Sequence, residues 1–116
     1  MVDQPLIRSR DNDRCVRCGT ADSLHVHHRR LRSQGGADTW ANQITLCTRC
    51  HNWAHHNVRL AHDDGLILWA GESPEDTRVK HWSWPHAPIW LNNDSTVSLW
   101  RDDEAGTEDG GGHLAW

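Results

Sequence analysis

The sequence lacks phenylalanine and tyrosine altogether, and only 36% of its 116 residues are hydrophobic. A chain of this length supports one compact domain, or a small domain with an appendage. Because a core made only of these hydrophobic side chains would be thin, we expect an additional staple. The 8 tryptophans take the place of the missing rings, and we expect them to fill core volume rather than to stack on nucleic-acid bases.

Long hydrophobic runs and internal repeats are also missing. No stretch is long enough to span a membrane, and residues 1–8 have no apolar segment of the kind that signal peptides carry. We therefore expect a cytoplasmic protein that makes no contact with a membrane. Cysteines in that reducing compartment more often bind metal or act in catalysis than form disulfides.

The basic residues are unevenly distributed along the chain, whose formal net charge is −4. Residues 1–62 carry nine arginines against five aspartates, a net charge of +4, and seven of the ten histidines. Residues 63–116 carry three basic residues against eleven acidic ones, a net charge of −8. A polyanion would therefore bind the first half, and the second half would repel DNA or shield the site.

Four cysteines form two C-x-x-C pairs, Cys15/Cys18 and Cys47/Cys50. One such pair alone is compatible with redox chemistry, but two pairs supply the four thiolates of a tetrahedral structural zinc site. Gly19 follows the first pair, where the backbone must turn back. Because more chain separates the pairs than a compact zinc ribbon needs, we expect an insert to fold between them.

The insert contains two short strand patterns. Residues 24–28 alternate between apolar and polar side chains, with Leu24 and Val26 expected to face the core. His28 then falls on that inward side or at the end of the strand, and His27 falls on the opposite side. Residues 43–46 form a second run, rich in β-branched residues, that should pair with the first.

A basic loop and a helix complete this pattern. The loop closes with a Gly-Gly pair and carries three candidate phosphate contacts, Arg29, Arg30 and Arg32. A helix is expected over about residues 49–61, where His51 and His55 lie one turn apart on one face. Two imidazoles at this spacing can bind a single metal ion.

The remaining patterns concern architecture. Residues 5–10 favour a short helix that begins with proline. Residues 66–70 and 96–100 are expected as strands, and residues 81–91, rich in tryptophan and proline, as an extended segment packed on the domain. The acidic, glycine-rich residues 101–116 are expected to be disordered.

In this order, the motifs resemble the HNH endonuclease family, in the zinc-knuckle subgroup common among phages and bacteria. The resemblance covers about residues 14–62 and rests on the cysteine pairs, the histidine-rich strand, the Gly-Gly pair, Asn42 and the helix histidines. The family fold is a β-hairpin crossed by a helix, with one divalent ion between them. The resemblance therefore implies an α+β fold: a zinc-stapled ββα-metal domain over residues 1–62, a partly extended, Trp-rich appendage over residues 63–100, and the acidic tail over residues 101–116.

The resemblance also implies roles for individual residues. His28 aligns with the general base of the family, and Asn42 with the asparagine that orients the base or assists the metal. His27, His51 and His55 correspond to ligands of a catalytic divalent ion, which would be Mg²⁺, Mn²⁺, Ni²⁺ or Zn²⁺. Because histidines crowd this strand, His27 remains an alternative base.

The activity implied is that of a metal-dependent endonuclease that nicks or cuts duplex DNA. We expect weak sequence preference, because so small a domain has few side chains to read bases. Recruitment by a partner protein such as a terminase, in the host cytoplasm, is expected if the chain is phage-encoded. An alternative keeps the fold without the activity: a zinc-stapled module that binds nucleic acid or protein. The family often has an apolar residue and a proline after the base, whereas this chain has Arg29-Arg30-Leu31.

Overall fold

The computed structural model describes residues 1–101, and it has the predicted α+β fold. The predicted disorder of the acidic tail falls almost wholly on residues outside this range. The described elements are, in order, α1 Gln4–Arg10, β1 Leu24–His28, the 3₁₀ turn η1 Arg32–Gln34, β2 Gln43–Cys47, α2 Thr48–His56, α3 Val58–Asp63, the 3₁₀ turn η2 Pro74–Asp76, β3 Val79–His81, β4 Trp84–Leu91 and β5 Val97–Ser98.

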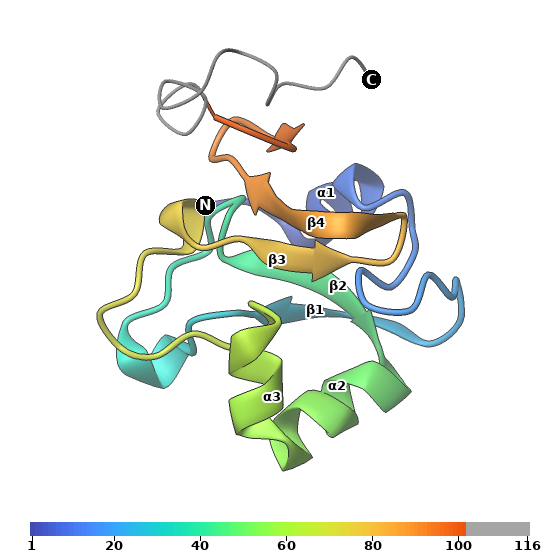
Figure 1. The fold of residues 1–116 in the computed structure, drawn as a ribbon, viewed down its shortest axis with the longest axis horizontal. Coiled ribbons are helices and arrows are strands. Elements are labelled where there is room, and N and C mark those ends of the chain that lie inside the picture. The colour runs from blue at the N-terminus through green and yellow to red at the C-terminus, as the bar shows by residue number, and fades with distance from the viewer. Residues whose placement is uncertain (102–116) are drawn as a thin grey trace.

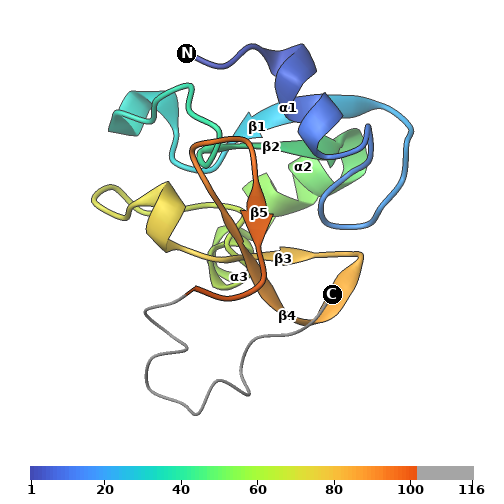
Figure 2. The ribbon, with the colours of Figure 1, turned by 90° about the horizontal axis from the view of Figure 1, so that it is seen from above.

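The central element is the β1–β2 hairpin, which pairs as predicted. Its antiparallel register places Leu24 opposite Cys47 and His28 opposite Gln43. Helices α2 and α3 lie along the β1 side of this hairpin (Figure 1). Seen from above, α1 lies on one side of the hairpin and β3–β4 on the other (Figure 2). The hairpin is therefore covered on several sides, and all five residues of β2 are buried.

The predicted single helix over residues 49–61 is in fact two helices, α2 and α3. The break falls at Asn57, whose backbone leaves the helical region with φ −135° and ψ 56°. Its side-chain Nδ2 donates to the carbonyl of Trp53, four residues earlier, at 2.9 Å. Asparagine competes in this way for backbone groups that a continuous helix would use, so the chain turns and α3 begins on a new axis.

The predicted strand over residues 66–70 is wrong. The amides of Leu66 and Ile67 both turn back to the carbonyl of Ala61, and the amide of Leu68 donates to the carbonyl of Arg29, the residue that follows β1. Residues 66–68 form a buried coil, because one such hydrogen bond does not make a strand. Residues 81–91 are extended as predicted, but they belong to a hairpin of β3 and β4. The strand predicted over residues 96–100 is reduced to β5.

The core lies between the hairpin, the two helices and the β3–β4 hairpin. Its fully buried members come from every part of the described chain: Ile7, Ile44, Leu46, Ala54, Ala61, Leu66, Leu68, Val79 and Leu91. All of these are aliphatic, as expected for a chain without phenylalanine or tyrosine. Among the described residues, no helix is long and apolar enough to cross a membrane.

Candidate metal centre and catalytic site

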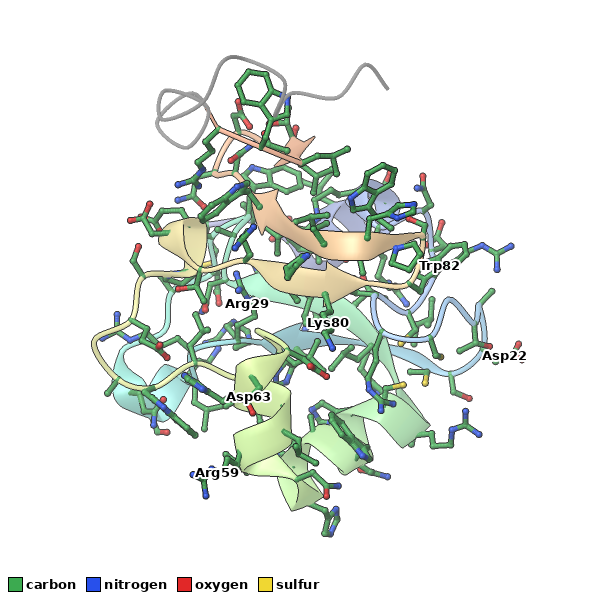
Figure 3. The ribbon with its side chains drawn as sticks, in the orientation of Figure 1. Asp22, Arg29, Arg59, Asp63, Lys80 and Trp82 are labelled. Carbon is green, nitrogen blue, oxygen red and sulfur yellow. The ribbon has the colours of Figure 1, made fainter. Side chains whose placement is uncertain are left out.

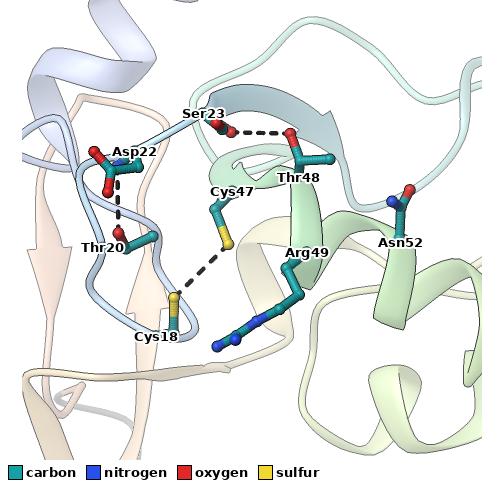
Figure 4. Close-up of a pocket in the computed structure, with 8 residues that line it drawn as sticks. All are labelled: Cys18, Thr20, Asp22, Ser23, Cys47, Thr48, Arg49 and Asn52. Carbon is teal, nitrogen blue, oxygen red and sulfur yellow. Dashed lines mark hydrogen bonds between the residues drawn. The ribbon is translucent and has the colours of Figure 1, made fainter.

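Four cysteines from two distant segments meet at one end of the hairpin. Cys47 is the last residue of β2 and Cys50 lies in the first turn of α2, whereas Cys15 and Cys18 lie in the loop before β1. All four Sγ atoms lie within 4.8 Å of one another. The Cys18 and Cys47 sulfurs are 3.8 Å apart (Figure 4), which matches the ~3.8 Å edge of a tetrahedron with Zn–S bonds of about 2.3 Å. These residues fit a structural zinc ion.

The backbone around the cysteines is built to hold thiolates. The amide of Cys18 donates to Cys15 Sγ and the amide of Cys50 to Cys47 Sγ, each at 3.4 Å. Burial raises the pKa of the Cys50 thiol to about 12. Without a cation this thiol stays protonated at neutral pH, so zinc binding must release its proton.

Three imidazoles meet between β1 and α2. The ring nitrogens of His27, His51 and His55 that could bind an ion all lie within 4.8 Å of one another. The Nε2 atoms of His51 and His55 are 3.2 Å apart, close to the ~3.3 Å expected for two imidazoles on one tetrahedral ion with metal–nitrogen bonds of about 2.0–2.1 Å. The set of three nitrogens fits a divalent cation with coordination positions left open.

The segment after α3 fixes the orientation of the His27 ring. Its Nε2 donates to the carbonyl of Leu66 at 2.8 Å, which leaves Nδ1 as the nitrogen free to bind an ion. A second-shell carbonyl of this kind fixes the tautomer and orientation of metal-binding histidines. Burial, with the charges of His51 and His55, lowers the pKa of His27 to about 4. The ring is therefore neutral at pH 7, as a ligand must be.

The orientation predicted for the strand is reversed. His27 is 3% exposed, and the rings of both His25 and His27 contact the ring of His51 on α2. Because side chains alternate along a strand, His28 shares the other face with Leu24 and Val26. His28 therefore lies beside the histidine cluster in sequence but is not one of the three residues that share the ion site.

His28 has a carboxylate partner that the sequence did not reveal. Its Nε2 donates to Asp38 Oδ1 at 2.6 Å, and the two side chains are only 15% and 12% exposed. Arg32 Nη2 donates to both carboxylate oxygens of Asp38 at 2.9 Å. The hydrogen bond from His28, followed by the charge of Arg32, lowers the pKa of Asp38. The only sequence signal for this pair is a carboxylate ten residues after a histidine, and that spacing is too common to be specific.

Asn42 clamps the loop between β1 and β2 and makes no described contact with the His28 ring. Its Oδ1 accepts from the amide of Arg30 at 2.7 Å, and its Nδ2 donates to the carbonyls of Arg30 and Ala37 at 3.0 and 2.9 Å. The expected contact with the base is thus indirect: Asn42 fixes the backbone that leaves His28.

The three loop arginines predicted to contact phosphate differ in exposure. Arg29 is fully buried and donates to the carbonyls of Gly65, Ala41, Pro74 and Thr77, so its prediction as a DNA contact is wrong. Figure 3 shows Arg29 inside the molecule, whereas Arg59 points outwards. Arg30 is half-buried, and the Arg32 side chain is 70% exposed.

The hairpin, the crossing helix, the four sulfurs and the three imidazoles define a small ββα domain with two sets of metal ligands. Residues 15–57 match the family model described as HNH endonuclease. This match agrees with the resemblance over that segment, which is similar to the HNH endonuclease family. No curated protein and no solved structure matches the chain.

Proposed function

We propose that the protein is a metal-dependent endonuclease that hydrolyses phosphodiester bonds in duplex DNA. Residues 1–62 would form the nuclease unit, and residues 63–100 an extension that completes it. Hydrolysis of a phosphodiester needs a nucleophilic water, neutralisation of charge on the phosphoryl oxygens, and help for the departing oxygen. The residues gathered around β1 can provide these three functions.

His27, His51 and His55 would hold the divalent ion. When bound, such an ion polarises the phosphate and stabilises the leaving oxygen. The lowered pKa of His27 supports a neutral ligand at this position. The proposed ligand role also argues against His27 as the base, because a ring whose lone pair binds an ion cannot take a proton from water.

His28 is the better candidate for the base. Its Nε2 carries the proton donated to Asp38, so in the neutral ring Nδ1 holds the lone pair that would accept a proton from water. Among the described residues, none forms a hydrogen bond with Nδ1 of His28 that would compete for this lone pair. Asn42 would assist by fixing the loop that follows the base.

Arg30 and Arg32 would contact the DNA backbone. Both lie in the loop that follows β1, and Arg32 is exposed. Phosphate contacts position a protein on DNA without reading its sequence, which supports weak sequence preference. A partner such as a terminase, and a cytoplasmic location, remain predictions.

The observation that carries this proposal is the convergence of His27, His51 and His55 within 4.8 Å in a segment that matches the HNH endonuclease family. The test is incubation of purified protein and His28→Ala with supercoiled plasmid and Mg²⁺, Mn²⁺ or Ni²⁺, with EDTA as the control. We expect cleavage that needs the divalent ion and falls by about 10²–10⁴-fold in His28→Ala, with zinc content unchanged. Stoichiometric zinc without any cleavage would select the non-catalytic module instead.

A further inference from the structure

The carboxylate of Asp38 joins two side chains that the proposed function uses for different tasks. On one side it accepts a hydrogen bond from His28 Nε2 at 2.6 Å. On the other it accepts two hydrogen bonds from Arg32, both at 2.9 Å. The side chain of Asp38 is 12% exposed while that of Arg32 is 70% exposed, so the carboxylate lies in the interior of the loop and the guanidinium at its surface.

This arrangement fixes His28 in two ways. A carboxylate has no proton to donate, so the proton in the hydrogen bond must sit on Nε2, and in the neutral ring the lone pair is then on Nδ1. The short bond also limits rotation of the imidazole about its side-chain torsions. A general base needs both the correct tautomer and the correct orientation before it can accept a proton. Arg32 grips both oxygens of Asp38, which keeps the carboxylate itself from rotating.

The loop does not need Asp38 for its closure. Asn42 already makes three hydrogen bonds to the loop backbone, and the amide of Gly36 donates to the carbonyl of Leu31 at 2.9 Å. Among residues 1–101, the carboxylate of Asp38 accepts hydrogen bonds from His28 and Arg32 alone. Its placement is therefore explained by the histidine that it orients.

We propose that Asp38 is the positioning residue of the general base, holding His28 with Nδ1 available to the attacking water. This inference rests on the proposed nuclease function. Arg32 would add a link to the substrate, because the same guanidinium that holds Asp38 is exposed where a DNA phosphate would lie. Asp38 would not touch the DNA, the water or the metal ion.

Magnetic resonance of the full chain with ¹⁵N-labelled histidine tests the contact without reference to activity. In the wild type we expect the Nε2 proton of His28 to be protected from exchange and shifted downfield by its hydrogen bond. Asp38→Ala should lose this signal. Asp38→Asn should retain it in weakened form, because the amide oxygen can still accept. A His28 Nε2 proton that is unchanged in Asp38→Ala would overturn the inference.

Kinetics test the role. Asp38→Ala should lower kcat for plasmid nicking at least about 10-fold, and by no more than the ~10²–10⁴-fold expected for loss of the base, while KM changes little. Asp38→Asn should recover part of the loss. Combining Asp38→Ala with His28→Ala should cost little more than His28→Ala alone, because residues that act as a unit are not additive. Asp94→Ala, which removes a carboxylate from the β4–β5 turn, should cut like the wild type.

The outcomes separate this inference from the function on which it rests. If the wild-type protein does not nick DNA, both the proposed nuclease function and the proposed role of Asp38 are contradicted. A wild type that nicks while Asp38→Ala nicks equally fast removes only the role of Asp38. Losses that multiply in the double variant would also overturn it, since they would show that Asp38 acts independently of His28.

Discussion

Arg29 lies in a run of basic residues that predicts phosphate contacts, yet its side chain is fully buried. The sequence alone cannot tell a phosphate-binding arginine from a buried one, because the burial of Arg29 depends on residues 65–78, which pack over its side chain. Within residues 1–101, no carboxylate lies within hydrogen-bonding distance of the guanidinium, which is held by main-chain carbonyls instead. Burial lowers the pKa of Arg29 to about 9, so it remains charged at neutral pH.

Replacement of Arg29 should therefore destabilise the fold rather than weaken DNA binding alone. In Arg29→Met, the buried carbonyls of Ala41 and Gly65 and the partly buried carbonyls of Pro74 and Thr77 lose their donor. Each buried group left unsatisfied costs about 1–3 kcal/mol. We expect the free energy of unfolding in urea to fall by at least about 3 kcal/mol. Arg59→Met, on the exposed surface of α3, is the control and should change it by less than about 0.5 kcal/mol. Equal stability of the two variants would contradict the assigned role.

His81 makes stability depend on pH in a defined direction. Its Nδ1 accepts hydrogen bonds from the amide and the hydroxyl of Ser83 at 3.1 and 2.8 Å. Burial lowers the pKa of His81 below its ordinary value of 6.5, with the charges of Asp11 and Arg10 acting in opposite senses. As pH falls below about 6.5, the unfolded chain binds a proton at His81 that the folded chain does not bind. The free energy of unfolding therefore decreases as the pH falls.

The expected result is a pH-dependent difference between the wild type and His81→Asn. Asparagine can accept the same hydrogen bonds but does not titrate, so the stability of the wild type relative to this variant should decrease from pH 7.5 to pH 5. Urea unfolding at several pH values measures it. His86→Asn, at an exposed position on β4, serves as the control. A constant difference for His81→Asn over this range would refute the account.

At the scale of elements, the sequence pattern within a short segment predicted the strands and the clusters of metal-binding side chains. Alternation predicted β1 and β2 and their pairing, and the cysteine and histidine spacings predicted which side chains would gather. The face of β1 that α2 covers could not be predicted, because both faces of the hairpin are packed and periodicity alone does not choose between them. Asp38 was missed for the same reason: its partnership with His28 depends on how the loop folds back.

The loop that carries Arg30, Arg32 and Asp38 depends on Gly36. A Cβ at this position would lie 1.7 Å from the carbonyl oxygen of Arg30, so Gly36→Ala must displace backbone. We expect cleavage to fall by about 10²-fold, as small misplacements of catalytic groups can cause, while zinc content is retained. Gly71→Ala is the control for backbone strain without a clash, since its φ is +97° but a Cβ there meets nothing within 4 Å. Wild-type cleavage by Gly36→Ala would show that the loop geometry does not matter.

At the scale of the whole molecule, the C-terminal extension is part of the site. Leu66 supplies the carbonyl that orients His27, and the amide of Leu68 donates to the carbonyl of Arg29, the residue that follows β1. The Trp82 ring packs so closely on Gly19 that a Cβ there would lie 2.7 Å from it. Leu66, Leu68 and Trp82 lie outside the segment that matches the family, so family motifs alone could not predict these contacts.

Truncation tests this integration. A chain that ends at residue 62 loses the carbonyl that orients His27 and most of the groups that bind Arg29. We expect it to unfold cooperatively at far lower urea concentration than the full chain, or not to fold, even with zinc present. Deletion of residues 102–116 alone is the control and should leave the unfolding midpoint unchanged. A truncated chain that keeps both zinc and wild-type stability would establish residues 1–62 as an independent domain.

The most direct measurement of the central claim is the metal content and absorption spectrum of the protein loaded with Co²⁺. Two separate ligand sets, four sulfurs and three imidazoles, predict two ions per chain. One should show strong thiolate-to-metal absorption and be lost in Cys50→Ser. The other should lack that absorption and be lost in His51→Ala, while the thiolate-bound ion stays. A single thiolate-bound ion per chain, unchanged in His51→Ala, would contradict the claim that the three imidazoles share a metal ion.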